Sequence, residues 1–275
     1  MALPQHATLL ERIWHYMMCV IAGLICIFLV APNLIVIPLS FNSEPYFTFP
    51  MRGYSLRWYE ALFSSEEWRR AALNSLIVAT STTVLATSLG AFAALGLHRA
   101  KFAMKGLVTG LLISPMILPV IITAVSIYFF MSTLDLVNTR LGLILAHVVL
   151  AAPFVVITVS ATLSGLDMNL LRAAAGLGAG PLTVFFRVTM RLIMPGLVSG
   201  AIFALVTSLD DAVVSQFLTG PEQHTLPREM WKGIRQQINP VILSASSLLV
   251  LIALIVLAGM EWVRRYNSRM RGLKE

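Results

Sequence analysis

The chain has 275 residues, of which 57% are hydrophobic and only 12% are charged, and its mean hydropathy is +0.82. A soluble domain carries about 45–50% apolar and about 25% charged residues, so this composition excludes a soluble globular protein and indicates an integral membrane protein. We interpret the net charge of +7 as a signal for membrane topology, with contacts to anionic lipid; it gives no reason to predict nucleic-acid binding.

Apolar runs recur along the chain, and each is long enough to cross a hydrocarbon layer of about 30 Å as a helix. Only helices satisfy every backbone polar group within one such segment. We therefore predict an all-α fold with a single transmembrane domain over residues 1–275. Its six predicted transmembrane helices are residues 13–41, 73–97, 107–130, 141–163, 196–218 and 241–262.

The first span holds both cysteines, Cys19 and Cys26, which lie seven residues apart. We expect them to pack as free thiols, because free cysteine behaves as a small apolar residue. The five histidines are scattered without the spacing of metal ligands, so no metal site is predicted.

Prolines interrupt the third and fourth spans at Pro115, Pro119 and Pro153. A proline within a helix leaves a carbonyl without its backbone donor. Two interpretations remain: a break that lines a cavity or serves as a hinge, and a kink that only improves packing.

The insert between the fourth and fifth spans, residues 164–195, reads SGLDMNLLRAAAGLGAGPLTVFFRVTMRLIMP. Residues 170–175 favour a helix, and the glycines at 176, 178 and 180 should end it, since each costs about 1 kcal/mol against alanine in a helix interior. Pro181 suits the first turn of a second helix, and Pro195 is expected to end that helix before the fifth span. The insert is thus predicted to be a protruding pair of helices.

The fifth span holds two adjacent carboxylates, Asp210 and Asp211, about 14 to 15 residues from its cytoplasmic end. At 1.5 Å per residue they lie roughly 21–23 Å into a layer of roughly 30 Å. An ionised group near the centre costs about 2.5–3.5 kcal/mol on insertion scales. Because none of the six spans contains Lys or Arg, we expect the neutralising charge to come from water, a second subunit or the cargo.

Adjacent helical residues point about 100° apart, so we predict that one of the two carboxylates lines a pathway and the other meets a neighbouring helix. Ser208, Asp211 and Ser215 recur at i, i+3 and i+7, and so form a polar stripe on one face, with Asp210 beside it. The alternative is that the carboxylates form a solvated rim or a structural pair between subunits.

Basic residues are preferentially retained on the cytoplasmic side of a membrane. With a cytoplasmic N-terminus, 12 of the 20 Lys and Arg residues fall in cytoplasmic segments. This count predicts that both the N- and the C-terminus are cytoplasmic.

Several segments resemble a known family. RAAAGLGAGP (residues 172–181) with FFRVTMRLIMPG (185–196) resembles the coupling loop of binding-protein-dependent ABC transporter permeases, although Arg172 stands where the family usually has Glu and Met190-Arg191 where it usually has Leu-Pro. YSLRWYEALF (54–63), ISPMILP (113–119) and SLDDAVVSQFLTGP (208–221) resemble the spermidine/putrescine branch. The resemblance covers nearly the whole chain.

The resemblance implies a bacterial inner-membrane permease that imports putrescine or spermidine, and is not itself an enzyme. It implies four kinds of partner: a second permease subunit, two ATPase subunits, a periplasmic polyamine-binding protein and the polyamine itself. No cofactor is expected, because the chain lacks the G-x-x-x-x-G-K-[ST] phosphate loop, so ATP would bind the partner ATPase. The residues implied to contact the ATPase are Arg172, Ala173, Ala174, Gly178, Pro181 and Pro195, and those expected along the cargo pathway are Asp210, Asp211, Ser208 and Ser215.

Three alternatives remain. The same machine could import another small solute, such as ferric iron, an opine or an aminophosphonate. A secondary transporter would need no ATP. An intramembrane aspartyl protease would need two catalytic Asp residues on facing helices, whereas Asp210 and Asp211 are adjacent on one predicted helix.

Overall fold

The structure, a computed structural model, describes residues 8–46, 50–100, 102–236 and 239–270. Within these ranges its regular secondary structure is helical, apart from one isolated bridge between Asn42 and Tyr54. Three of the basic residues counted toward the cytoplasmic side, Lys101, Arg271 and Lys274, lie outside the described residues. The chain divides into two compact units, Met1–Ser64 with Gln236–Glu275 and Ser65–Arg235.

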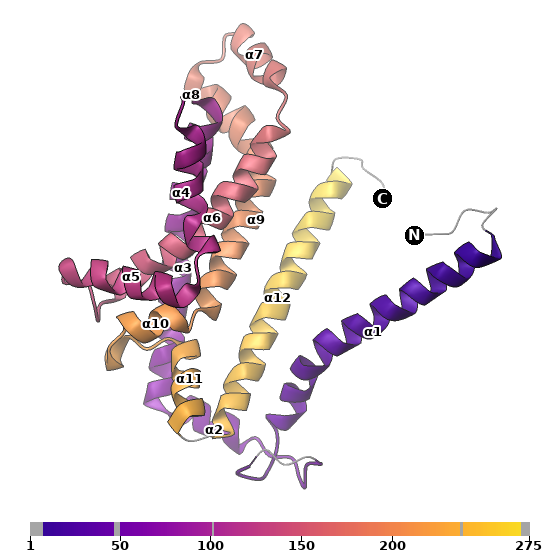
Figure 1. Ribbon diagram of the computed structural model, residues 1–275, viewed down its shortest axis with the longest axis vertical. Coiled ribbons are helices and arrows are strands. Elements are labelled where there is room, and N and C mark those ends of the chain that lie inside the picture. Colours follow the sequence, from indigo (N-terminus) through magenta and orange to yellow (C-terminus); the bar gives the residue numbers. More distant parts are fainter. Residues whose placement is uncertain (1–7, 47–49, 101, 237–238, 271–275) are drawn as a thin grey trace. The chain divides into compact units, whose positions relative to one another are not determined.

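The first unit contains α1 (Leu9–Leu39), α2 (Arg57–Ser64) and α12 (Val241–Met270) (Figure 1). Helix α1 is apolar along its length and buries none of its residues, as a lipid-facing helix would. The hydroxyl of Tyr59 lies 2.6 Å from that of Ser40 and 2.7 Å from that of Ser247. Since Ser40 ends α1 and Ser247 belongs to α12, this one side chain links all three helices.

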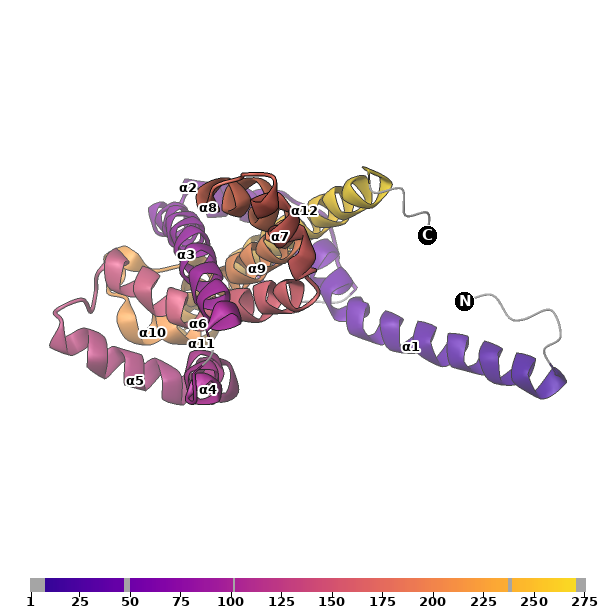
Figure 2. The same ribbon diagram turned by 90° about the horizontal axis from the view of Figure 1, so that it is seen from above.

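The second unit is built on three packed helices, α3 (Glu66–Arg99), α6 (Arg140–Ser164) and α9 (Met190–Asp210), which Figure 2 shows from above. They approach closely through small residues, the usual packing mode of membrane helices. A Cβ on Gly90 of α3 would lie 2.7 Å from the Cβ of Val155 in α6. The core around these contacts consists of Ala86, Ala94, Val148, Ala151, Val155, Val159, Leu163, Ile193 and Ala204.

The predicted third span, residues 107–130, is interrupted, as its prolines predicted, and the interruption lies at Pro119. The span forms α4 (Lys105–Ile117) and α5 (Val120–Thr133), which are bent by 109° at the break between them. Leu118 has an extended backbone, with φ −71° and ψ 146°, because the ring of Pro119 disfavours the helical region for the residue before it. Pro119 is therefore a break, whereas Pro115 and Pro153 lie inside continuous helices.

The predicted end of the coupling insert at Pro195 is also wrong, because Pro195 lies inside α9. Helix α8 (Pro181–Val184), a π-helical turn (Phe185–Thr189) and α9 follow one another without a gap. Membrane helices tolerate proline where local π adjustments and neighbouring side chains satisfy the freed backbone groups. The second helix of the insert thus continues into the fifth span.

The fifth span itself ends earlier than predicted. Helix α9 stops at Asp210, Asp211 has an extended backbone, and the short helix α10 (Val213–Leu218) follows. A 3₁₀ turn (Pro221–Gln223) and α11 (Leu226–Gln236) then complete the second unit.

In the part of the chain that the structure describes, four helical runs are long and apolar enough to cross a membrane: α1, α3, α6 and the run Pro181–Asp210. The bent pair α4–α5 would make a fifth, and the apolar part of α12, Val241–Val256, is shorter. An all-α membrane protein is thus confirmed, with four or five candidate spans by these criteria where six were predicted.

Candidate functional site

The side chain of Asp211 lies at the break in the fifth span and binds the start of α10 there. One carboxylate oxygen accepts a hydrogen bond from the backbone N–H of Val214 at 3.2 Å. The other accepts from the backbone N–H of Ser215 at 2.9 Å and from its hydroxyl at 3.1 Å. Asp211 therefore caps the N-terminus of α10, whose first N–H groups have no partner within the helix.

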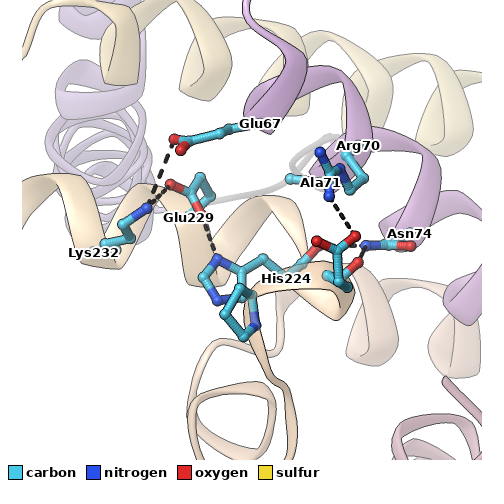
Figure 3. A pocket seen from close by; sticks show the side chains of 9 residues that line it. Glu67, Arg70, Ala71, Asn74, His224, Glu229 and Lys232 are labelled. Atoms are coloured by element: carbon cyan, nitrogen blue, oxygen red, sulfur yellow. Dashed lines mark hydrogen bonds and ion pairs between the residues drawn. The ribbon is translucent and has the colours of Figure 1, made fainter. Parts of the chain in front are cut away.

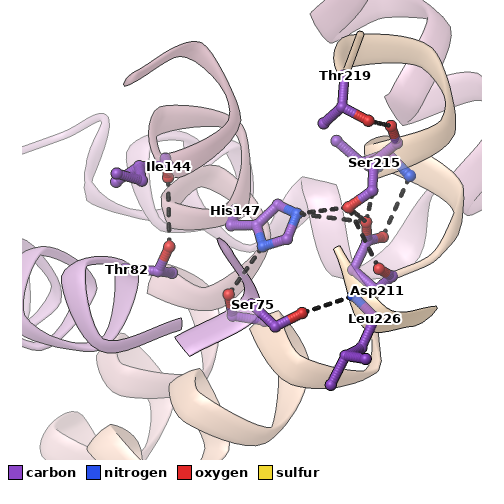
Figure 4. Close-up of polar contacts among 10 residues, drawn as sticks. Ser75, Thr82, Ile144, His147, Asp211, Ser215, Thr219 and Leu226 are labelled. Atoms are coloured by element: carbon purple, nitrogen blue, oxygen red, sulfur yellow. Dashed lines mark hydrogen bonds and ion pairs between the residues drawn. The ribbon is translucent and has the colours of Figure 1, made fainter. Parts of the chain in front are cut away.

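His147 reaches into this break from α6 (Figure 4). Its Nδ1 lies 2.8 Å from the hydroxyl of Ser208, in the last turn of α9. Its Nε2 lies 3.3 Å from Oδ2 of Asp211 and 3.4 Å from the hydroxyl of Ser215. Because an ionised carboxylate only accepts, Nε2 is the nitrogen that donates toward Asp211. The imidazole thus ties the end of α9 to the start of α10.

This cluster corrects the expectation that Asp211 finds its partner outside the chain. The side chains of His147 and Asp211 are only 1% and 6% exposed, so each is enclosed with the other. His147 was not among the predicted site residues, although a histidine inside a predicted span without Lys or Arg was the available signal. The polar stripe of Ser208, Asp211 and Ser215 does come together, but around an imidazole and across a helix break.

Asp210 lies in a different environment from its neighbour. It is the last residue of α9 and is exposed. Within the described part of the chain, its carboxylate makes no hydrogen bond or ion pair. The two adjacent carboxylates are therefore physically distinct, one enclosed with partners and the other open.

The coupling lobe, defined here as α7 and α8 with the turn between them, lies at the opposite end of the Pro181–Asp210 run from Asp210 (Figure 1). Helix α7 (Met168–Gly176) begins where the side chain of Asp167 accepts a hydrogen bond from the N–H of Asn169 at 2.8 Å. Gly178 adopts φ +85°, a conformation that other residues rarely take. The predicted order of helix, glycine turn and helix is confirmed.

The coupling lobe exposes apolar as well as charged side chains. Leu177 is 90% exposed, Leu182 74% and Phe186, just beyond the lobe, 63%. Arg172 and Ala173 are exposed, and Ala174 is half-buried. An apolar face of this kind, next to a basic residue, is suited to dock into a partner.

A polar pocket of about 200 Å³ lies where the first turns of α3 face α11 (Figure 3). The buried carboxylate of Glu229 accepts a hydrogen bond from Nζ of Lys232 at 2.8 Å and lies 2.6 Å from Nδ1 of His224. The hydrogen bond that Lys232 donates to Glu229 raises the pKa of the Lys232 ammonium group. Asn74 donates to the carbonyl of His224 at 3.0 Å, so this network holds the segment after α10 against α3.

Comparisons with known proteins agree on one family. Residues 86–272 match the family described as binding-protein-dependent transport system inner membrane component. The chain is similar to the spermidine/putrescine transport system permease protein PotC of Escherichia coli (strain K12), with 31% identity over 88% of this chain and 91% of PotC. It is also similar to the putrescine transport system permease protein PotI of the same strain, with 33% identity over 90% of this chain and 91% of PotI.

Solved structures share the fold at lower identity. A chain of a bacterial ABC transporter involved in the import of the acidic polysaccharide alginate superposes with a TM-score of 0.74 and 14% identity, covering 96% of this chain and 99% of that one. A chain of the MetNI methionine ABC transporter gives a TM-score of 0.54 with 18% identity, covering 74% of this chain and 98% of that one. The match over most of the chain shows that this protein belongs to the binding-protein-dependent inner-membrane components, the permease subunits of ABC importers.

Proposed function

We propose that this protein carries putrescine or spermidine across the bacterial inner membrane as one permease of an ATP-driven importer. The observation that carries this proposal is the similarity to PotC and PotI along about nine-tenths of the chain. The site chemistry agrees with it, because polyamines carry ammonium groups and the carboxylate of Asp210, at the end of α9, has no cationic partner among the residues that the structure describes. A carboxylate at membrane depth favours a cationic cargo over an anionic one.

We propose that the chain crosses the membrane six times as one permease domain, with both termini in the cytoplasm. The six segments would be α1, α3, the bent pair α4–α5, α6, the Pro181–Asp210 run and α12. In this arrangement the coupling lobe lies in the cytoplasm and the break at Asp211 lies toward the outer side. The basic residues of the predicted cytoplasmic segments support the orientation.

We propose that the coupling lobe docks into an ATPase subunit. The exposed side chains of Leu177 and Leu182 offer the apolar contact, and Arg172 offers a positive charge to an acidic position of the partner. The remaining members of the proposed docking set are Ala173, Ala174, Gly178, Pro181 and Pro195. By this proposal the importer also contains a second permease, a second ATPase and a periplasmic binding protein that delivers the cargo.

The Pro181–Asp210 run gives the lobe a mechanical link to the cargo site. Its 30 residues form a rod of about 45 Å at 1.5 Å per residue. Because the run is continuous from the lobe to Asp210, movement of the lobe by the ATPase would be transmitted to the break in the fifth span. This provides a route by which ATP-driven closure could switch access to the site.

Uptake of radiolabelled putrescine and spermidine tests the proposed function. The permease is expressed with its ATPase, second permease and binding protein in cells that lack other polyamine importers. We expect accumulation that stops when ATP hydrolysis by the ATPase is abolished. Accumulation without any ATPase would indicate a secondary transporter instead. Preferential uptake of ferric iron, an opine or an aminophosphonate, with no polyamine uptake, would contradict the proposed cargo.

The coupling role makes a prediction at Gly178. A β-branched residue at φ +85° costs about 1–2 kcal/mol, so Gly178→Val should distort the turn of the lobe. A Cβ at this position would meet nothing within 4 Å, so the chain itself should still fold. We expect wild-type amounts of protein in the membrane but severalfold slower polyamine uptake, measured together with ATP hydrolysis by the complex.

The matched control is Gly178→Asn, because asparagine tolerates the left-handed region better than other residues with a Cβ. It should restore most of the uptake that Gly178→Val loses. Equal uptake by the wild type and Gly178→Val would show that the geometry of this turn does not matter for coupling.

A further inference from the structure

We propose that the two adjacent carboxylates at the break have different roles. Asp210 binds an ammonium group of the cargo, while Asp211, positioned by His147, only holds the break in shape. This inference rests on the proposed polyamine import and names the residue that meets the cargo. It assigns separate roles to side chains that are adjacent in sequence and identical in chemistry.

The carboxylate of Asp211 is enclosed and already has partners within the chain. Its two oxygens accept from two backbone N–H groups, those of Val214 and Ser215, and from the hydroxyl of Ser215. Nε2 of His147 lies 3.3 Å from the same carboxylate, and the Asp211 side chain is 6% exposed. A cargo amine could reach this carboxylate only by displacing the cap of α10.

Asp210 has the opposite properties. It is exposed and without a partner among the described residues. The last four carbonyls of any α-helix lack intrahelical donors, and the C-terminal end carries a partial negative charge. Asp211 has an extended backbone and donates no capping hydrogen bond within the described chain, so the end of α9 stays uncapped. A carboxylate beside uncapped carbonyls forms a site for a group with several N–H donors and a positive charge.

A primary ammonium group has these properties, since it carries one charge and three donors. Ends of discontinuous membrane helices with unwound carbonyls are known to coordinate cations in this way. The same surroundings would repel a carboxylate or a phosphonate. The subsite therefore takes the charged terminus of an alkyl amine and disfavours anionic solutes.

His147 acts in this arrangement as a positioning residue. It contacts Ser208 on one side of Asp210 and Asp211 on the other, so it fixes the chain on both sides of the cargo carboxylate. Because the side chain of Asp211 points toward His147 and Ser215, the side chain of Asp210 remains outside this cluster.

The first test compares Asp210→Asn with Asp211→Asn in the assembled importer, using putrescine as the cargo. Asn keeps the size of the side chain and removes its charge. We expect Asp210→Asn to raise the KM for putrescine about tenfold without changing the amount or the Tm of the complex. Asp211→Asn should lower the amount and the Tm, while the KM of the remaining complex stays within about twofold of the wild type. A raised KM for Asp211→Asn with an unchanged KM for Asp210→Asn would overturn the assignment.

The matched control is Asp135→Asn. Asp135 is an exposed carboxylate in the loop between α5 and α6, and its φ of +54° suits Asn as well as Asp. This variant removes the same charge near α10, which packs against α5, without touching the break. Its KM and Tm should equal those of the wild type. A tenfold rise of KM here too would show that net charge, and not the place of Asp210, controls affinity.

A second measurement is independent of transport. In a background of Cys19→Ala and Cys26→Ala, the thiols introduced by Asp210→Cys and Asp211→Cys are treated with a cationic methanethiosulfonate in the assembled complex. We expect Asp210→Cys to react, more slowly when putrescine is present, and Asp211→Cys to stay unreactive. Reaction of Asp211→Cys alone would refute the inference. If the wild type imports no polyamine but Asp210→Cys alone reacts, the proposed cargo is contradicted. The inferred difference in accessibility between positions 210 and 211 would still be supported.

Discussion

The His147→Leu variant is expected to lose about 3 kcal/mol of stability and to accumulate in the membrane at a small fraction of the wild-type amount. Leucine fills much of the space but offers no polar atom to Asp211 or Ser208. Removing one partner of a buried charged contact costs about 3–5 kcal/mol, and the two backbone N–H groups that Asp211 keeps offset part of this. Thermal unfolding of the purified complex in detergent measures the effect.

Two variants serve as controls for His147→Leu. His147→Gln keeps a donor and an acceptor at the end of the side chain, and should recover a large part of the lost stability. His98→Leu replaces an exposed histidine near the end of α3 and should leave the Tm unchanged. A His147→Leu complex as stable as the His98→Leu complex would mean that the polar cluster at the break does not stabilise the fold.

The predicted spans agree with the structure where hydropathy alone decides the outcome. The bounds of α1, Leu9–Leu39, and of α6, Arg140–Ser164, lie within a few residues of the predicted ones. Burial in lipid depends on local composition, which one sequence displays directly. The helix, glycine turn and helix of the coupling lobe were predictable for the same reason, since each glycine acts on its own neighbours.

The prolines show that local sequence does not decide whether a helix breaks. Pro119 breaks its helix and Pro195 does not, although both were expected to interrupt one. The result depends on whether neighbouring groups satisfy the carbonyl that each proline frees, four residues before it. A single sequence does not display these neighbours.

The candidate site was predictable in part. The spacing of Ser208, Asp211 and Ser215 correctly predicted that these side chains lie together. Their common partner His147 was missed because it is 61 residues from Ser208 and 68 from Ser215 in the chain, beyond any helical periodicity. A difference between Asp210 and Asp211 was expected from the 100° between helical neighbours. Which of the two is enclosed was not predicted, since that depends on the helix end between them, and a pattern of residue types does not place that end.

The Gly200→Val variant is expected to lose about 3 kcal/mol, close to the upper end of the usual cost of overpacking. A Cβ at Gly200 would lie 2.7 Å from the hydroxyl of Thr158 and 3.0 Å from the Cα of Val155 in α6. The backbone of α6 is itself fixed between α3 and α9, so it cannot yield cheaply to two further methyl groups. The fraction of protein that survives detergent extraction as a monodisperse species measures the loss.

The matched control is Gly110→Val in α4, where an added Cβ would meet nothing within 4 Å. Valine is a slightly better helix former than glycine, so this variant should be as stable as the wild type or more stable. Gly200 lies eight residues, or about 12 Å, before Ser208 along α9. Any Gly200→Val protein that folds must hold α9 farther from α6, which separates Ser208 from His147 and should slow uptake as well. Normal stability and uptake with Gly200→Val would contradict close packing of α9 on α6, and with it the link from the coupling lobe to the break.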